Sequence, residues 1–250
     1  DYLTITSARL FAELLGMQGS KSGGAGAGAS KEDLIKERLE EFLEKLPDSF
    51  NIHEMSGRVP PEERTPYINV AFQEANRMNR LLSAISQGLK EVRLGLKGEL
   101  TVTPAMEAIE NALFFDTVPP GWGKVLGPST KPLGLWYVDV LERAKFLEAW
   151  IGDFALPSTV WLGGLFNPQA FLTAISQQTA RKNEWPLDKV VLNVDVMKKF
   201  NREDFQSPPR EGAYLFGLYM AGARWDTQAG TIVDARLKEL CPKMPILFCK

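Results

Sequence analysis

The sequence contains a single histidine, and this scarcity excludes several kinds of active site. His53 is followed by Glu54, as in a zinc-protease helix, but Gly57 stands where the second histidine would be needed. A metal site built from several histidines is therefore excluded, and so is a triad oriented by a second histidine. A triad that uses His53 itself stays formally open, although no G-x-S-x-G nucleophile elbow accompanies it.

Cysteine is almost as scarce. Cys241 and Cys249 are the 2 cysteines in 250 residues, and their spacing is not that of a metal site. They could pair across a hairpin, but so few cysteines favour a reduced, intracellular protein with two ordinary thiols. No secretory signal is visible. The sequence starts at Asp1 rather than methionine and stops on a strand-like run, so we expect both ends to be cut from a longer protein.

Long apolar runs and an excess of one charge are also missing. No stretch reaches the roughly 18 apolar residues that span a bilayer. The 29 Lys and Arg residues are interleaved with 31 Asp and Glu, giving a net charge of -2. This balance predicts neither nucleic acid nor a membrane surface as a partner. A hydrophobic content of 44% is enough for one large domain or two small ones.

No phosphate-binding loop is present. Gly123 and Lys124 make a near-match, but Val125 follows the lysine and Val118 occupies the position of the first glycine. The glycine-rich run GSKSGGAGAGAS, residues 19–30, follows no hydrophobic strand and ends in no Lys-Ser or Lys-Thr. We interpret it as a flexible linker.

Apolar residues at helical spacing and recurrent start signals predict a long helical part. The stripe Leu10, Phe11, Leu14 and Leu15 predicts a first helix before the linker. Helix starts are predicted at four further places by an N-cap residue or a change of pattern, namely Ser30, Thr65-Pro66, Thr103-Pro104 and Asn167-Pro168, with another helix over residues 133–151. Prolines and glycines at residues 119–121 and 127–128 predict an irregular loop.

The pattern changes near residue 185. Runs rich in β-branched and aromatic residues predict short strands at residues 190–194, 214–220, 223–225, 231–233 and 245–249, with a turn at 228–230. Helices followed by a series of short strands are the order of an α+β protein.

Two residue types in the strand-rich part are candidates for chemistry. The carboxylates of Glu211, Asp226 and Asp234 could meet in a cleft and serve acid–base catalysis. The alternative is that they pair with neighbouring arginines at 210, 224 and 236 and stabilise the strands. Trp161, Trp185 and Trp225 could stack a ligand, although aromatic residues at helix–strand junctions are more often part of the core.

Several long strings resemble the C-terminal region of dynein heavy chains. They are LPSTVWLGGLFNPQAFLTAI (156–175), TARKNEWPLD (179–188), PPREGAY (208–214) and GARWDTQ (222–228), with ERTPY (63–67) and LGLKGEL (94–100) upstream. Together they cover nearly the whole sequence. NEWPL (183–187) and GARWD (222–226) resemble the axonemal type, and TQAGTI (227–232) leans towards the outer-arm β class.

The resemblance implies a place in a large motor. Residues 1–18 would end the sixth AAA+ module, residues 19–30 would be a linker, residues 31–184 the helical part of the C-terminal domain, and residues 185–250 its antiparallel, incomplete β-barrel-like part. The parent would be an ATPase that moves towards microtubule minus ends and powers ciliary and flagellar beating in the axoneme. ATP and Mg²⁺ would bind elsewhere in that motor. The partners implied are the other AAA+ modules of the heavy chain and, through the parent complex, microtubules and other dynein chains.

For these 250 residues themselves the resemblance implies a structural and regulatory cap. We therefore expect no catalytic, cofactor-binding or metal-binding residue in them, and no enzyme activity of their own. Two alternatives stay open: a stand-alone hydrolase that uses the carboxylates around Glu211 and Asp226, and a scaffold that binds partner proteins through its helical half. Leu10, Phe11, Leu14 and Leu15 are the residues expected to expose an apolar strip.

Overall fold

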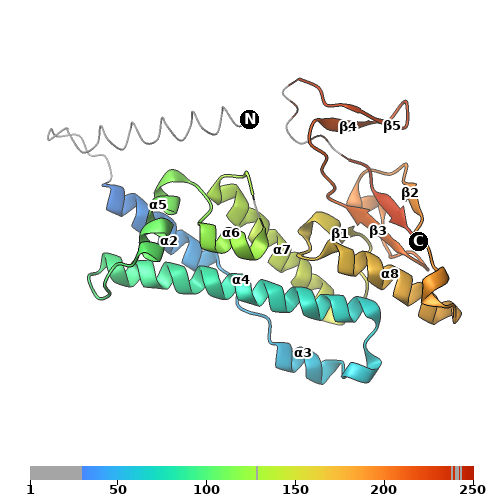
Figure 1. Cartoon of the computed structure of the whole chain (residues 1–250), viewed down its shortest axis with the longest axis horizontal. Coiled ribbons are helices and arrows are strands. Elements are labelled where there is room, and N and C mark those ends of the chain that lie inside the picture. Colours follow the sequence, from blue (N-terminus) through green and yellow to red (C-terminus); the bar gives the residue numbers. More distant parts are fainter. Residues whose placement is uncertain (1–29, 128, 238, 240–241, 243) are drawn as a thin grey trace. The chain divides into compact units, whose positions relative to one another are not determined.

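The computed structural model describes residues 30–250 apart from 128, 238, 240–241 and 243. The predicted helix at 1–18, nearly all of the predicted linker, and Cys241 lie outside the described residues. In the described part, α-helices are followed by short strands (Figure 1), which confirms the α+β fold class.

The elements follow in this order. The helices are α2 (Lys31–Lys45), α3 (Ile52–Arg58), α4 (Pro66–Leu96), α5 (Pro104–Phe115), α6 (Pro120–Leu126), α7 (Leu133–Asp153) and α8 (Pro168–Asn183). The strands are β1 (Val160–Trp161), β2 (Val194–Val196), β3 (Ala213–Phe216), β4 (Ala223–Asp226), β5 (Thr231–Asp234) and β6 (Leu247–Cys249). Short 3-10 turns lie at η1 (Pro61–Glu63), η2 (Leu162–Gly164), η3 (Leu187–Lys189) and η4 (Arg202–Asp204).

The predicted helix starts are confirmed by their caps. The Ser30 hydroxyl accepts a hydrogen bond from the Asp33 backbone N–H, and the Asp33 carboxylate in turn accepts from the Ser30 N–H, which is a complete capping box. Thr103 caps α5 and Asn167 caps α8 through their side-chain oxygens, each followed by proline at the first helical position. These caps satisfy backbone N–H groups that a helix start leaves without partners.

The predicted irregular loop after residue 119 is wrong, because residues 120–126 form α6. Pro120 stands at the first helical position, where its missing N–H costs nothing. Trp122 is buried and stacks on Trp136 of α7 with 6.0 Å between ring centroids. Burial of this ring stabilises a short helix that its two glycines disfavour locally. The short helix α3 was not predicted either. Met55 is its one buried residue, so α3 has no apolar stripe that the sequence pattern could reveal.

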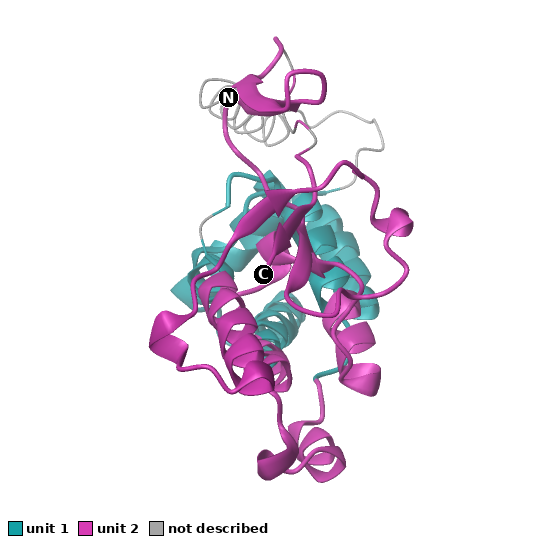
Figure 2. Ribbon diagram, turned by 90° about the vertical axis from the view of Figure 1, so that its right-hand side faces the viewer, with its two compact units in different colours: residues 1–49, 78–144 teal, residues 50–77, 145–250 magenta. Residues whose placement is uncertain are grey.

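The structure divides into two compact units (Figure 2). The first, residues 1–49 and 78–144, is helical in its described part. Its core is the stripe of α4 that contains Met78, Leu81, Ile85 and Leu89, none of which is exposed. Phe42 of α2 stacks on Tyr137 of α7 at 4.1 Å, and the Tyr137 hydroxyl donates to the Phe42 carbonyl. This contact and the apolar stripe hold the helices of the unit together.

The second unit, residues 50–77 and 145–250, contains α3, α8 and all six strands of the described part. Its helical core centres on Phe171 of α8, which packs against Tyr67 and Trp150 at 5.6 and 5.9 Å. The helices α4 and α7 each contribute residues to both units.

The strands form two small sheets. One has the order β1-β3-β6-β2, and the other is the hairpin β4–β5. All pairs are antiparallel except β1–β3, which is parallel. The described residues therefore form small sheets and no closed barrel. The predicted domain boundaries stay predictions, and β1 comes from the range predicted to be helical.

Three predicted strands are shorter than expected, and one of them, predicted over residues 245–249, covers only Leu247–Cys249. The run 190–194 becomes a strand only at Val194, because the ladder with β6 begins at the backbone pair Asn193–Lys250, with N···O distances of 2.8 and 3.0 Å. The run 214–220 ends at Phe216, because Gly217 takes a φ of 73 that an extended strand does not allow. The predicted hairpin around residues 228–230 is confirmed.

Candidate functional site

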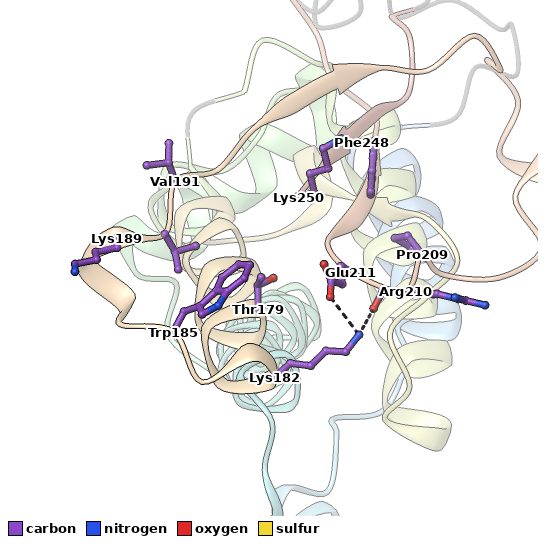
Figure 3. Close-up of a pocket in the computed structure, with 11 residues that line it drawn as sticks. Thr179, Lys182, Trp185, Lys189, Val191, Pro209, Arg210, Glu211, Phe248 and Lys250 are labelled. Atoms are coloured by element: carbon purple, nitrogen blue, oxygen red, sulfur yellow. Dashed lines mark hydrogen bonds and ion pairs between the residues drawn. The ribbon is translucent and has the colours of Figure 1, made fainter.

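A groove of about 840 Å³ lies in the second unit, where the end of α8 faces β6 and the segment before β3 (Figure 3). We call it the α8–β6 groove. Its lining consists of Thr179, Lys182, Trp185, Lys189, Val190, Val191, Pro209, Arg210, Glu211, Phe248 and Lys250. The volume falls in the range of binding clefts, which is about 300–1,000 Å³.

Lys182, in the last turn of α8, ties the helix to the segment before β3. Its ammonium donates to the Arg210 carbonyl at 3.0 Å and pairs with the Glu211 carboxylate at 3.5 Å. The side chains of Lys182 and Glu211 are about half exposed, at 50% and 47%, so water screens the pair and it contributes little to stability. Loss of this ion pair would therefore cost little free energy of unfolding.

A smaller hollow of about 280 Å³ shares Lys182 and Glu211 with the groove and reaches Tyr67 at the start of α4. The Tyr67 hydroxyl donates to the Gly212 carbonyl at 3.4 Å. Burial raises the pKa of Tyr67 to about 12, so the phenol stays neutral at physiological pH. Tyr67 thus acts as a hydrogen-bond donor that fixes the backbone next to the groove.

The walls of the groove are apolar. Figure 3 shows Trp185 and Val191 on one side, with Phe248 and Pro209 on the other. Trp185 is 57% exposed and Val191 is 84% exposed. Apolar side chains of this size that line a concave surface are typical of a binding site rather than of a simple solvated face.

Cations surround these walls. The lining includes Lys182, Lys189, Arg210 and Lys250 against a single carboxylate, that of Glu211. The Lys250 ammonium pairs with Asp195 of β2 at 2.8 Å and lies 5.4 Å from the centre of the Phe248 ring. Lys189 and Arg210 have no carboxylate within ion-pair distance among the described residues. The lining is therefore predominantly positive.

The three candidate carboxylates are not brought together as a catalytic set. Glu211 lies in the groove, and its partner is Lys182 rather than the predicted Arg210. Asp226 and Asp234 stand at opposite ends of the β4–β5 hairpin, since Asp226 is opposite Thr231 and Asp234 is opposite Ala223. Three register steps separate them, which is roughly 10 Å.

Asp226 shapes the hairpin turn. Its carboxylate accepts backbone hydrogen bonds from Gln228 at 2.9 Å and Ala229 at 3.3 Å. The N–H groups of Gln228 and Ala229 hold the pKa of Asp226 below its usual range. The predicted ion pair with Arg224 is present at 4.0 Å. Such a carboxylate stabilises a turn and is poorly suited to act as a general acid.

The three candidate tryptophans have different surroundings. Trp161 stacks on Phe216 of β3 at 6.4 Å, and a Cβ at Gly217 would collide with its indole ring. Trp225 lies opposite Ile232 in the hairpin. Only Trp185, among these three, lines the α8–β6 groove.

The other candidates lie outside the groove. His53 lies in α3, and Lys124 is exposed in the last turn of α6. Cys249 is buried in β6, and burial raises the pKa of its thiol. Within the described ranges, no three His, Cys, Asp or Glu side chains are placed to hold a metal ion. In the same ranges, every helix is too short or too polar to cross a membrane.

Sequence reasoning missed a buried carboxylate. Glu74 of α4 has no exposed surface, and it accepts hydrogen bonds from the backbone N–H groups of Phe166 and Asn167 at the start of α8. It also pairs with Arg77 at 3.1 Å. The spacing of Glu74 and Arg77 is common on solvated helix faces, so the sequence offered no signal that this pair is structural.

Comparison with known proteins gives matches along nearly the whole sequence. A family model for the C-terminal domain of the dynein heavy chain matches residues 4–250. The chain is 58% identical over 250 residues to dynein axonemal heavy chain 9 of Homo sapiens, with 100% of this chain and 6% of the relative covered. It is 58% identical over 250 residues to the ciliary dynein beta chain of Heliocidaris crassispina, with the same coverage.

A more distant relative is the flagellar outer-arm dynein beta chain of Chlamydomonas reinhardtii. It is 42% identical over 238 residues, which cover 95% of this chain and 5% of the relative. The 250 residues thus span about one-twentieth of the length of the relatives they match.

Proposed function

The chain belongs to the family of dynein heavy chains and matches their C-terminal domain, and on this basis we propose that it is the capping and regulatory region of an axonemal motor. The parent heavy chain hydrolyses ATP with Mg²⁺ and moves towards microtubule minus ends to power ciliary and flagellar beating. Its place is the axoneme. The partners of the cap are the AAA+ modules of the same heavy chain, and the parent complex brings it to microtubules and other dynein chains.

The main support for this proposal is the match of the dynein C-terminal domain model to residues 4–250, which is almost the whole sequence. Ciliary and flagellar beta chains among the relatives support the outer-arm β class. We assign residues 1–18 to the end of the sixth AAA+ module, 19–30 to a linker, 31–184 to the helical part and 185–250 to the β part.

We infer that the cap acts without a catalytic group of its own. Asp226 forms a turn, Glu211 is tied to Lys182, and Glu74 holds the start of α8. These carboxylates have structural partners, and they do not converge on a common point where a water molecule could be activated.

The helices α4 and α7 support a bracing role. They are the longest helices of the described residues, with 31 residues in α4 and 21 in α7. A brace that contacts the ring differently in two states shifts the equilibrium between them by its differential contact energy. Couplings of this kind are typically about 1–3 kcal/mol, or about 5- to 150-fold in an equilibrium constant.

Isothermal calorimetry of the 250-residue protein with Mg-ATP tests the absence of a nucleotide site. We expect no saturable heat at millimolar ATP, because the sequence has no phosphate loop. The matched variants are Lys124→Ala, which removes the near-match lysine, and Lys131→Ala, which removes an exposed lysine elsewhere. Micromolar binding that Lys124→Ala abolishes and Lys131→Ala preserves would contradict the proposal.

A further inference from the structure

We propose that Ser207 is a phosphorylation site for a proline-directed protein kinase of the class that also selects a basic residue three positions after the serine. The four residues that carry this inference are consecutive, Ser207-Pro208-Pro209-Arg210. They lie in the second unit, in the segment between η4 and β3. The inference goes beyond the capping role, since it assigns a covalent modification to one loop of the cap.

The segment has the features that such kinases recognise. Proline-directed kinases act on a serine or threonine directly before a proline, and they bind their substrates as extended segments. Pro208 fits both conditions, because a proline disfavours the helical backbone for the residue before it. Arg210 supplies a positive charge at the third position after the serine, where kinases of the cyclin-dependent class present complementary negative charge.

The structure leaves Ser207 available for this reaction. The residue is exposed, and it lines neither the α8–β6 groove nor the smaller hollow. In the described part of the sequence, no hydrogen bond joins residues 206–209 to any other residue. The segment can therefore enter the cleft of a kinase without loss of secondary structure.

Contacts on both sides hold the ends of this segment. Phe205 is buried, and its ring centre lies 4.5 Å from that of Tyr214 in β3. The Arg210 carbonyl accepts a hydrogen bond from Lys182 at 3.0 Å. The Arg210 guanidinium, by contrast, has no ion-pair or hydrogen-bond partner among the described residues, so its charge is free to contact a kinase.

Two other Ser-Pro or Thr-Pro pairs occur in the 250 residues, and neither fits as well. Thr65-Pro66 and Thr103-Pro104 stand at helix starts, where each proline is the first helical residue. The two threonine hydroxyls accept hydrogen bonds at 3.3 Å from the backbone N–H groups of Ile68 and Met106. Ile68 and Met106 are also the third residues after the threonines, so the basic residue is missing from both sites.

The reaction is a phosphoryl transfer from ATP that the kinase holds with Mg²⁺. The Ser207 Oγ attacks the γ-phosphorus, the bond from that phosphorus to the β,γ-bridging oxygen breaks, and ADP leaves. The hydroxyl proton passes to the catalytic aspartate of the kinase. The phosphate carries about −1.5 to −2 charges at pH 7, which turns a segment with one positive charge into a negative one.

Phosphorylation by a cyclin-dependent kinase tests the proposal on the 250-residue protein and on the parent heavy chain. Mass spectrometry locates the phosphate, and we expect it at Ser207 in both preparations and at neither Thr65 nor Thr103. In the 250-residue protein, Ser207→Ala should abolish incorporation. Ser129→Ala is the matched control, since it removes an exposed serine that no proline follows, and incorporation should not change.

Two charge variants of the 250-residue protein test the role of the basic residue. Arg210→Gln should lower kcat/KM for Ser207 about tenfold, because a charge-assisted contact with the kinase is lost. Lys198→Gln removes an exposed cation elsewhere in the second unit, and it should leave kcat/KM within about twofold of the unaltered value. Circular dichroism checks that each variant is folded.

Three results would overturn the inference: no phosphate at Ser207, equal kcat/KM for Arg210→Gln and Lys198→Gln, and modification of the 250-residue protein without modification of the parent heavy chain. The last result would show that Ser207 is covered in the motor. None of the three bears on the capping role, which does not depend on Ser207.

Discussion

Glu74 is a buried carboxylate in the second unit, and its charge must be compensated by partners. Two backbone N–H groups and Arg77 do so. The N–H groups belong to Phe166 and Asn167, the two residues directly before α8, and Asn167 is the N-cap of that helix, whose start carries a partial positive charge. Glu74 therefore joins α4 to α8 through a charge that neither helix could hold alone.

Removing the Glu74 carboxylate should be costly. Glu74→Ala leaves the part-buried N–H groups of Phe166 and Asn167 without this acceptor, and we expect a loss of about 3 kcal/mol in the free energy of unfolding. Glu74→Gln keeps the shape and one acceptor oxygen, so its loss should be smaller, about 1–2 kcal/mol. Urea unfolding followed by circular dichroism measures both values.

The control for Glu74 is Glu41, an exposed carboxylate that pairs with Lys45 one helical turn away. Glu41→Ala should change the free energy of unfolding by about 0.5 kcal/mol or less. If Glu74→Ala were no more destabilising than Glu41→Ala, the start of α8 would not depend on the buried carboxylate.

At the scale of elements, the close approach of β3 and β6 depends on a glycine. Gly212 has a φ of 78 and precedes β3, and a Cβ at this position would collide with the carbonyl of Cys249 in β6. Gly222, with a φ of 71, has the same backbone requirement but no atom within 4 Å of the position of a Cβ. A comparison of alanine substitutions at the two glycines therefore separates the cost of the left-handed backbone from the cost of steric overlap.

Gly212→Ala should therefore destabilise the protein by about 2–4 kcal/mol, of which about 1–2 kcal/mol is the left-handed backbone and the rest is the displaced β6 backbone. Gly222→Ala should show only the backbone part, about 1–2 kcal/mol. Urea unfolding of the two variants side by side gives the comparison. Equal losses for both would show that the sheet accommodates a methyl group at residue 212.

The elements also show how far the sequence predicts the fold. Helix starts at Ser30, Thr103 and Asn167 were predictable because caps act within a few residues. The turn between β4 and β5 was predictable for the same reason. The helix α6 was not, because its stability comes from Trp122 packing on Trp136 of another helix.

Neither the strand pairing nor the groove could be predicted from the sequence. The parallel β1–β3 pair joins Val160 to Leu215, and neither segment carries a signal of the other. Trp185 was a candidate aromatic from the sequence, but its place in a groove with Phe248 depends on the fold. The candidate carboxylates could be identified from the sequence. The pairing of Glu211 with Lys182 could not, because it depends on where α8 lies in the fold.

At the scale of the whole molecule, the sequence resemblance to axonemal dynein heavy chains is confirmed by matches over the entire sequence. Long identical strings identify a family more securely than short motifs, because each additional matched residue makes a chance match less frequent. The candidate catalytic residues Glu211 and Asp226 have structural partners in the described residues.

We propose that the cap changes motor output without contributing to nucleotide chemistry. The most direct test compares the parent heavy chain with a form that lacks residues 31–250, measuring ATP turnover and microtubule gliding velocity on the same preparations. We expect ATP turnover to persist, while velocity, force or run length changes by about fivefold or more. Unchanged motility, or loss of nucleotide binding in a ring that remains folded, would contradict it.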